Sequence, residues 1–144
     1  MILYFYAKDG TPGCTTQGCD FRDLLPRLEP AGVAVLGVSP DSVRSHARFK
    51  AKLALPFPLL SDAEHKVAEQ YGVWARKQLF GHWYWANRRT TFIISATGRI
   101  ERVWEDVEYR GHAAAVLAWL EGERPKLDSA HNARRAPRAE SSRR

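Results

Sequence analysis

Cysteine is scarce in this sequence, and long apolar runs are absent. Two cysteines among 144 residues cannot build a disulfide scaffold. The five histidines are scattered, and no pair of them has metal-ligand spacing beside the cysteines, so these residues make a poor zinc site. No uncharged stretch is long enough to cross a bilayer, which excludes a transmembrane helix.

The N-terminal segment MILYFYAKDG also lacks the marks of a secretory leader. It has no basic stretch before its apolar residues and no small-residue cleavage site. We therefore expect a cytoplasmic protein. Two nearby cysteines in that reducing compartment favour redox chemistry over a structural disulfide.

Positive charge is concentrated at the C-terminal end. The chain has 22 basic and 16 acidic residues, of which seven basic and three acidic residues lie in 123–144. Residues 1–122 therefore hold 15 basic and 13 acidic residues, a net charge of +2. The segment 123–144 has no aromatic or β-branched residue, so it cannot bury enough apolar surface to order itself. The composition predicts one domain at 1–122 and a basic disordered tail. A nucleic-acid-binding arm is the alternative, which the lack of aromatic residues for base stacking disfavours.

Within residues 1–122, apolar periodicity predicts alternating strands and helices. The expected strands cover 2–6, 33–39, 57–60, 91–95 and 100–104, and the expected helices start near residue 12 and cover 42–53, 62–71 and 111–122. Pro26 should kink or divide the first helix. This order predicts an α/β protein with a central mixed β-sheet flanked by helices, in which strand 2–6 lies beside strand 33–39. That is the plan of a thioredoxin-like fold.

The periodicity also predicts which side chains are buried. On helix 42–53 the inward residues should be Ala47, Phe49 and Leu53. His65 and His112 should lie on helix surfaces. Four aromatic residues lie between the expected helix 62–71 and the expected strand 91–95: Phe80, Trp83, Tyr84 and Trp85. They could line a substrate or partner face, but core packing or a hydrophobic contact surface is favoured.

The segment 11–19, TPGCTTQGC, carries the clearest functional signal. Cys14 lies where a strand has ended and a helix begins. Unpaired backbone N–H groups and the positive end of the helix dipole stabilise a thiolate at that position. The polar, turn-like surroundings favour a reactive thiol over a small buried hydrophobe.

Cys19 lies five residues after Cys14 on the same helix. Ideal helix geometry separates their Cα atoms by roughly 8–9 Å, whereas a disulfide needs them within about 7 Å. The helix must therefore unwind before the two can bond, and the intervening threonines and Gly18 lower the cost of unwinding. Cys19 also falls on an apolar stripe with Phe21 and Leu25, so we expect it to be buried when reduced and bridged when oxidised.

The same region resembles a known family. YFYAKDGTPGCTTQGCDFRD is similar to the active-site stretch of peroxiredoxins of the peroxiredoxin Q type, also called bacterioferritin comigratory protein. The resemblance continues in LLSDAEHKVAEQYGVW and in RTTFII, and it covers about residues 2–121. A threonine three residues before the cysteine, a second cysteine five after it and an arginine before TTF form a specific combination.

The resemblance implies a thioredoxin-like fold and the reduction of hydrogen peroxide and organic hydroperoxides. The family's peroxidatic cysteine falls on Cys14, its assisting threonine on Thr11, its arginine on Arg89 and its resolving cysteine on Cys19. It also implies an intramolecular disulfide that thioredoxin or a similar dithiol reduces, in a monomer without cofactor. Because adjacent side chains of a strand point to opposite faces, only one of Arg88 and Arg89 can reach the site.

Two features depart from the family pattern. Ala7 stands where the family usually has proline, which would fix the active-site loop, and the domain is expected to be N-terminally shortened relative to the family. Two other functions are kept as alternatives. A dithiol reductase or isomerase would need Cys-x-x-Cys instead of four intervening residues, and an inactive truncated domain could bind nucleic acid through its basic tail.

Overall fold

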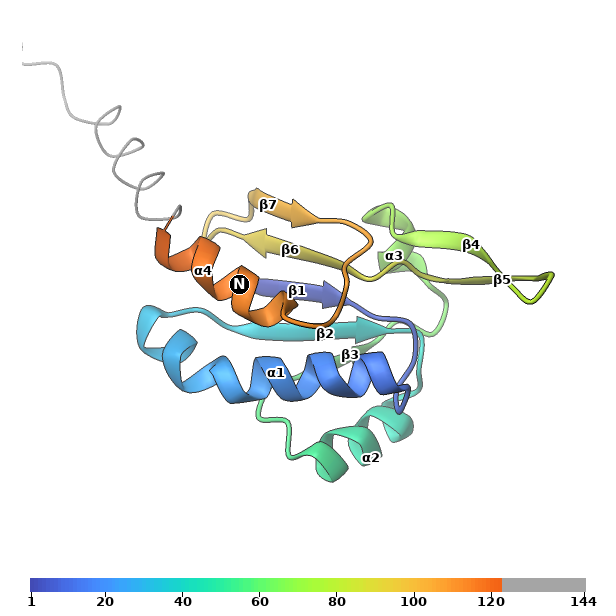
Figure 1. Ribbon diagram of the computed structural model, residues 1–144, viewed down its shortest axis with the longest axis horizontal. Helices are drawn as coiled ribbons and strands as arrows, with labels where there is room; N and C mark the ends of the chain where they lie inside the picture. Colours follow the sequence, from blue (N-terminus) through green and yellow to red (C-terminus); the bar gives the residue numbers. More distant parts are fainter. Residues whose placement is uncertain (123–144) are drawn as a thin grey trace, which may run out of the picture.

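A five-stranded mixed sheet organises the chain in the computed structural model, which describes residues 1–122 (Figure 1). The expected disordered tail, 123–144, lies outside the described residues. In chain order the elements are β1 (Ile2–Phe5), α1 (Pro12–Leu28), a 3₁₀ helix (Glu29–Ala31), β2 (Val35–Ser39), α2 (Val43–Leu53), β3 (Leu59–Ser61), α3 (Lys66–Gln70), β4 (Trp74–Leu79), β5 (His82–Asn87), β6 (Thr90–Ile94), β7 (Ile100–Trp104) and α4 (His112–Gly122).

The strand order in the sheet is β3-β2-β1-β6-β7. β1, β2 and β3 are parallel neighbours, whereas β6 is antiparallel to both β1 and β7. The expected pairing of the first two strands is confirmed, with Ile2 opposite Val35. The pairing follows from chain connectivity, because a right-handed crossover through α1 returns the chain beside the strand it left.

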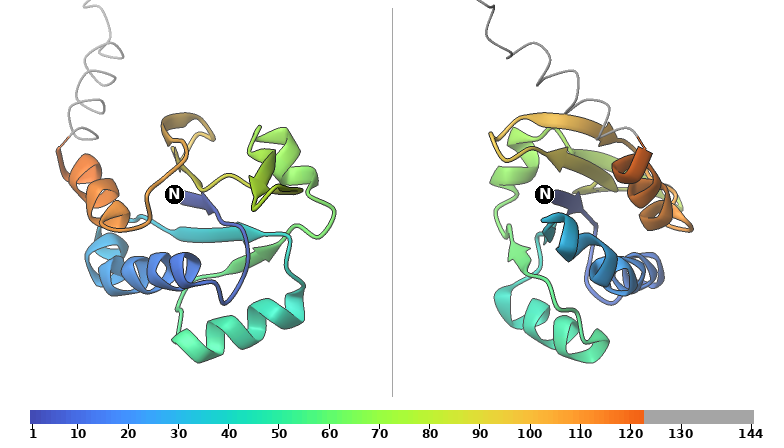
Figure 2. Two further views of the ribbon diagram at one scale, coloured as in Figure 1. Left: turned by 45° about the vertical axis from the view of Figure 1, so that its right-hand side comes forward. Right: turned by 90° about the vertical axis from the view of Figure 1, so that its left-hand side faces the viewer.

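Helices cover both faces of the sheet (Figure 2). Ile2 and Tyr4 of β1 point into a core shared with α1 and α4, and Leu3 and Phe5 point into a second core that includes α3. α1 and α4 pack against each other, and α2 contacts β3 at the edge of the sheet. None of the helices described in residues 1–122 is long and apolar enough to cross a bilayer.

α1 runs through Pro26 without being divided, so of the expected kink or division the division is wrong. Pro26 is exposed and lies only two residues before the end of the helix. A proline at that position removes one hydrogen bond from the last turn, which the chain then tightens into the 3₁₀ helix.

α3 is shorter than the expected helix 62–71. The Asp62 carboxylate accepts hydrogen bonds from the backbone N–H groups of Val67 and Ala68, at 3.1 and 2.9 Å, so the residues before α3 form a turn instead of a helical segment. His65 lies in that turn in the left-handed conformation, with its ring stacked on Trp74 at 4.2 Å. It is therefore half-buried beside a strand and does not lie on a helix surface.

α2 buries only part of the face expected. His46 and Phe49 are buried and Leu53 is half-buried, but Ala47 is exposed. Positions 46, 49 and 53 share one side of a helix at 3.6 residues per turn, and Ala47 is rotated away from each of them by about 100° or more. The buried histidine is the feature that apolar periodicity could not show.

The segment 74–87 forms a two-stranded hairpin, β4 and β5, where no strand was expected. Its two-residue turn is Phe80–Gly81, with φ angles of 50° and 78°, which is the geometry of a type I′ turn. Both faces of the hairpin are largely open to solvent, so its sequence shows little alternation of apolar and polar residues. Phe80, Trp83, Tyr84 and Trp85 are exposed, so the expectation of core packing for these aromatic residues is wrong. The alternative expectation of a hydrophobic contact surface stays a prediction.

Candidate active site

Cys14 lies in the first turn of α1, and its side chain is 2% exposed. Thr11 is the residue before the helix, with extended backbone angles, and Pro12 follows at the first helical position. Proline fits there because the first N–H groups of a helix have no partner within the helix. The local sequence therefore places the thiol at the end of the helix that favours an anion.

Arg89 reaches this thiol from the start of β6. Its Nη2 donates to Cys14 Sγ at 3.5 Å, and its Nη1 donates to Gln17 Oε1 at 2.7 Å. The neighbouring Arg88 is exposed, so Arg89 is the arginine that faces the site. Gln17 was not anticipated from the sequence, although it lies three residues after Cys14 and hence on the same face of α1.

Tyr109, in the link between β7 and α4, packs over the same arginine. The Arg89 guanidinium lies 5.4 Å from the centre of the Tyr109 ring. A Cβ atom on Gly13 would lie 2.8 Å from that ring and 3.0 Å from Arg89 Nη2. Only glycine allows this close approach, and no local pattern in the sequence marks Tyr109 as part of the site.

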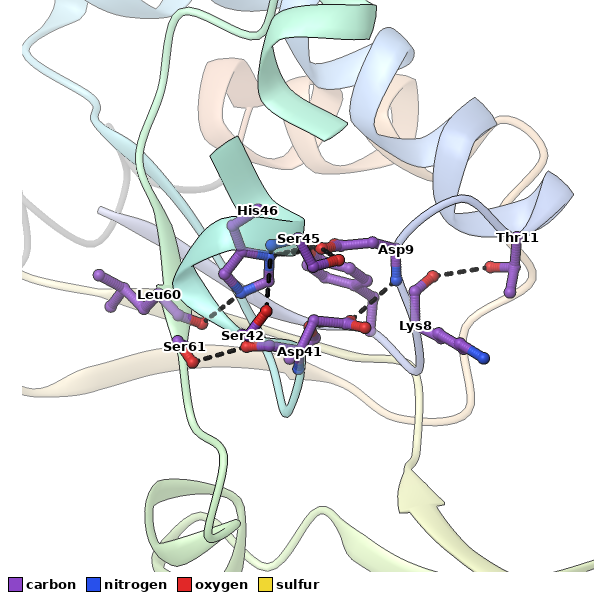
Figure 3. Close-up of polar contacts among 11 residues, drawn as sticks. Lys8, Asp9, Thr11, Asp41, Ser42, Ser45, His46, Leu60 and Ser61 are labelled. Carbon is purple, nitrogen blue, oxygen red and sulfur yellow. Dashed lines mark hydrogen bonds and ion pairs between the residues drawn. The ribbon is translucent and has the colours of Figure 1, made fainter. Parts of the chain in front are cut away.

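Thr11 presents its hydroxyl group at the start of the same turn. Its Oγ1 donates to the backbone carbonyl of Lys8 at 3.0 Å, as Figure 3 shows. Since the single hydroxyl proton is used in that bond, the lone pairs of the oxygen are left to accept a hydrogen bond. The hydrogen bond to Lys8 thus leaves the Thr11 hydroxyl able to accept a hydrogen bond at the site but not to donate one.

Cys19 lies on α1 with Cys14, and both thiols are free. Cys19 is half-buried, less than the expectation of a buried position. The buried face of α1 includes Gly18, Phe21 and Leu25, and Cys19 is not among its buried residues. The half-buried position leaves its sulfur closer to solvent than a core residue would be.

His112 is buried under the site, so its expected place on a helix surface is wrong. Its Nε2 lies 2.8 Å from Thr91 Oγ1, and its ring packs edge-on against Phe21 and Trp104. Burial, helped by the charge of Arg89, lowers the pKa of His112 to about 4. The ring is therefore neutral at physiological pH and acts as a packed, hydrogen-bonded part of the core.

Comparisons with known proteins match this arrangement to one family. The AhpC/TSA family matches residues 1–103. Over 120 residues the chain is 52% identical to the putative peroxiredoxin Bcp of Coxiella burnetii, covering 83% of this chain and 80% of that protein. It is 47% identical to peroxiredoxin Bcp of Bacillus subtilis, covering 83% and 76%. This chain belongs to the AhpC/TSA family of peroxiredoxins.

Solved structures support the same assignment. Xanthomonas campestris bacterioferritin comigratory protein, described for its alkyl peroxide reduction activity, superposes with a TM-score of 0.82 at 43% identity, covering 85% of this chain and 77% of that one. A mutant of Xanthomonas campestris peroxiredoxin Q superposes with a TM-score of 0.79 at 45% identity, covering 83% and 76%. The thioredoxin-like fold is confirmed, and this peroxiredoxin is a thiol peroxidase of the Bcp type.

Proposed function

We propose that Cys14 is the peroxidatic cysteine and that it reduces hydrogen peroxide and organic hydroperoxides. The observation that carries the proposal is the contact of Arg89 Nη2 with Cys14 Sγ, 3.5 Å, at the N-terminus of α1. A thiol held between a helix N-terminus and a guanidinium is set up to be an anionic nucleophile. The alkyl peroxide activity described for the Xanthomonas campestris relative supports the organic part of the substrate range.

The first step consumes one peroxide. The Cys14 thiolate attacks the nearer peroxide oxygen, the S–O bond forms as the O–O bond breaks, and the released alkoxide or hydroxide takes up a proton. Cys14 becomes a sulfenic acid, a two-electron oxidation, and the peroxide is reduced to alcohol or water. Arg89 donors stabilise the negative charge that develops on the oxygens, and the Thr11 oxygen accepts a hydrogen bond from the peroxide O–H.

The second step makes the disulfide. The Cys19 sulfur attacks the sulfur of the Cys14 sulfenic acid, the S–S bond forms, and water leaves. A dithiol such as thioredoxin then reduces the disulfide with two electrons and two protons. We place this cycle in a monomer in the cytoplasm, as the sequence predicts. Because both cysteines lie on α1, formation of the disulfide requires local unwinding of that helix.

Cys14→Ser tests the assignment, with Cys19→Ser as its matched control. Cys14→Ser should abolish peroxide consumption, because a serine hydroxyl is not a comparable nucleophile at neutral pH. Cys19→Ser should keep one round of Cys14 oxidation but lose the intramolecular disulfide, as seen by intact mass after one equivalent of peroxide. Turnover near the wild-type rate in Cys14→Ser would show that Cys14 is not the nucleophile.

A further inference from the structure

Asp9 is a buried carboxylate in the loop that leads from β1 to α1, and the chemistry above does not use it. It lies two residues before Thr11, and its side chain is only 5% exposed. A buried carboxylate in a surface loop is costly unless donors surround it. Figure 3 shows that two of its partners, Ser45 and His46, come from α2.

Four contacts hold Asp9. Tyr6 Oη donates to Asp9 Oδ1 at 2.6 Å, and Ser45 Oγ donates to Oδ2 at 2.8 Å. His46 Nδ1 lies 2.7 Å from the same Oδ2. The backbone N–H of Asp9 donates to Asp41 Oδ2 at 2.9 Å. The loop is therefore held through both the side chain and the main chain of one residue.

His46 faces oxygen acceptors with both ring nitrogens. Nδ1 points to Asp9 Oδ2, and Nε2 lies 3.1 Å from the carbonyl oxygen of Leu60 in β3. A neutral imidazole carries one N–H, so one of its nitrogens would direct a lone pair at an oxygen. The imidazolium form, with an N–H on each nitrogen, satisfies both contacts. Asp9, Asp41 and His46 could ligate a cation, but their donor atoms are already engaged with one another and with neighbouring groups.

The charges around His46 favour the protonated ring. Asp9 faces it from the loop after β1, and Asp41 faces it from the link between β2 and α2. Burial lowers the pKa of His46, but the hydrogen bond and charge of Asp9, the β3 carbonyl and Asp41 together raise it above its ordinary value of 6.5. The basic neighbours of His46 on α2, Arg44 and Arg48, are exposed and so are screened by solvent.

Tyr6 is the remaining titratable group that faces this ring. Its Oη lies 3.3 Å from His46 Nδ1, and it stays protonated because burial and its hydrogen bond to Asp9 raise its pKa. For Asp9, burial raises the pKa, but the hydrogen bonds from His46, Tyr6 and Ser45 more than compensate, so its pKa is lowered. Asp9 and His46 thus form a buried pair of opposite charges.

The loop has little else to fix it. Ala7 stands where a proline would restrict the backbone, and Gly10 adopts a left-handed φ of 80°. Lys8 and Thr11, which share the hydrogen bond that orients the threonine hydroxyl, lie on either side of Asp9. If the contacts of the Asp9 side chain were lost, Lys8 and Thr11 would therefore both be free to move, and their hydrogen bond would no longer orient the threonine hydroxyl.

We propose that His46, as an imidazolium ion, is a positioning residue for peroxide reduction: it holds the Asp9 carboxylate, and Asp9 holds the loop that presents Thr11 beside Cys14. The proposal rests on the roles proposed above for Cys14 and Thr11. His46 does not touch the reacting atoms. It acts through the loop, and its effect should vanish when the ring loses its proton.

The first test is a nitrogen-resolved NMR titration of the reduced wild-type protein. At pH 6.5, the ordinary pKa of histidine, most His46 rings should carry protons on both nitrogens and lose one as the pH rises further, whereas a mostly neutral His46 at pH 6.5 would overturn the proposal. This measurement needs no variant and no peroxidase activity. It is independent of whether Cys14 is the nucleophile.

The second test compares two reactions of Cys14 in wild type and in His46→Gln. Stopped-flow oxidation by hydrogen peroxide requires Thr11, whereas alkylation by iodoacetamide requires only the thiolate. Because both reactions depend on the Cys14 thiolate, the ratio of their rates isolates the contribution of Thr11. In wild type the ratio should fall as the pH rises through the pKa of His46. In His46→Gln the ratio should be lower than the wild-type ratio at pH 6.5, on the order of tenfold or more for a misplaced group, and independent of pH.

His65→Gln is the matched control, because it makes the same change in a histidine–carboxylate pair that does not contact Asp9; His65 Nδ1 lies 3.0 Å from Glu69 Oε1. It should keep the wild-type ratio and pH profile. Ser45→Ala, which removes one donor to Asp9 and no charge, should lower the ratio less and in the same direction. Should His46→Gln fail to fold, Ser45→Ala and the wild-type profile decide the question.

Two results of the rate comparison would overturn the proposal. One is a wild-type ratio and profile in His46→Gln, and the other is an equal loss of both reactions, which would mean that His46 supports the fold without positioning Thr11. Failure of the proposed function gives a different signature. In that case Cys14→Ser would still consume peroxide, whatever the state of His46.

Discussion

Arg89 joins three parts of the chain at the candidate active site. It contacts Cys14 and Gln17 on α1 and the Tyr109 ring in the link before α4. These contacts fix the direction of the guanidinium before any peroxide arrives. Preorganised donors of this kind stabilise developing charge without reorganising during the reaction.

Arg89→Ala should slow the oxidation of Cys14 by hydrogen peroxide on the order of a hundredfold, because it removes the donors aimed at the sulfur and the peroxide oxygens. Arg88→Ala is the natural control, since Arg88 is the adjacent, exposed arginine. Stopped-flow measurement of the second-order rate constant compares the two. Equal losses in both variants would mean that the contact of Arg89 with Cys14 does not govern the reaction.

At the level of elements, α1 has two tasks that oppose each other. Its intact first turns hold Cys14 against Arg89, yet its unwinding is needed for Cys19 to reach the oxidised sulfur. Gly18 lies between the two cysteines, and a Cβ there would meet Leu55 and Leu53 side chains at ordinary distances of 3.6 to 3.9 Å. Packing therefore allows alanine at this position, and the presence of glycine eases local opening.

Gly18→Ala should stabilise α1 by up to about 1 kcal/mol, which makes opening up to roughly fivefold rarer. The sulfenic acid of Cys14 should then persist longer and over-oxidise to sulfinic acid at lower peroxide, whereas the first oxidation step should barely change. Intact mass across a peroxide titration measures the sulfinic fraction. Thr16→Ala, an exposed change on the same stretch, should act in the same direction.

An unchanged sulfinic fraction in both variants would show that helix opening does not control disulfide formation. A disulfide found only between chains would contradict the intramolecular step. A shift in Gly18→Ala alone would point to its contacts with Leu53 and Leu55 and away from helix propensity.

For the molecule as a whole, two buried histidines respond to pH in opposite directions. The folded-state pKa of His112 is lowered from 6.5 to about 4, because burial disfavours its charged form, while that of His46 is raised beside Asp9. His112 stabilises the fold fully above pH 6.5, and this contribution is lost as the pH falls towards 4, since the unfolded chain binds the proton first. His46 stabilises the fold fully below pH 6.5, and its contribution is lost as the pH rises through its raised pKa.

His112→Gln should therefore reduce the loss of stability between pH 6.5 and 4, because an amide does not titrate and can still bond to Thr91. Urea unfolding midpoints measured across that range provide the comparison. His82→Gln, at an exposed histidine, should keep the wild-type dependence. If His112→Gln also kept the full wild-type slope, the titration of His112 would not be its cause.

The sequence by itself determined the local parts of this protein. The alternation of apolar runs placed the central strands, and a strand end followed by Thr-Pro-Gly placed Cys14 at a helix N-terminus. Such features depend on the periodicity and conformational preferences of neighbouring residues, which a single segment contains. The hairpin of β4 and β5 was missed because it is largely exposed on both faces and therefore lacks that periodicity.

Only the tertiary structure decided which distant side chains meet. Arg89 is 75 residues from Cys14 and 72 from Gln17, and His46 is 37 from Asp9. The local sequence shows that Gln17 and His46 are polar but does not show whether they are buried. Their burial and their hydrogen-bond partners are set only when another element packs on them. Burial makes their hydrogen bonds obligatory, and sheet register and helix packing supply the partners, which is why the contacts of the site could not be read from any one segment.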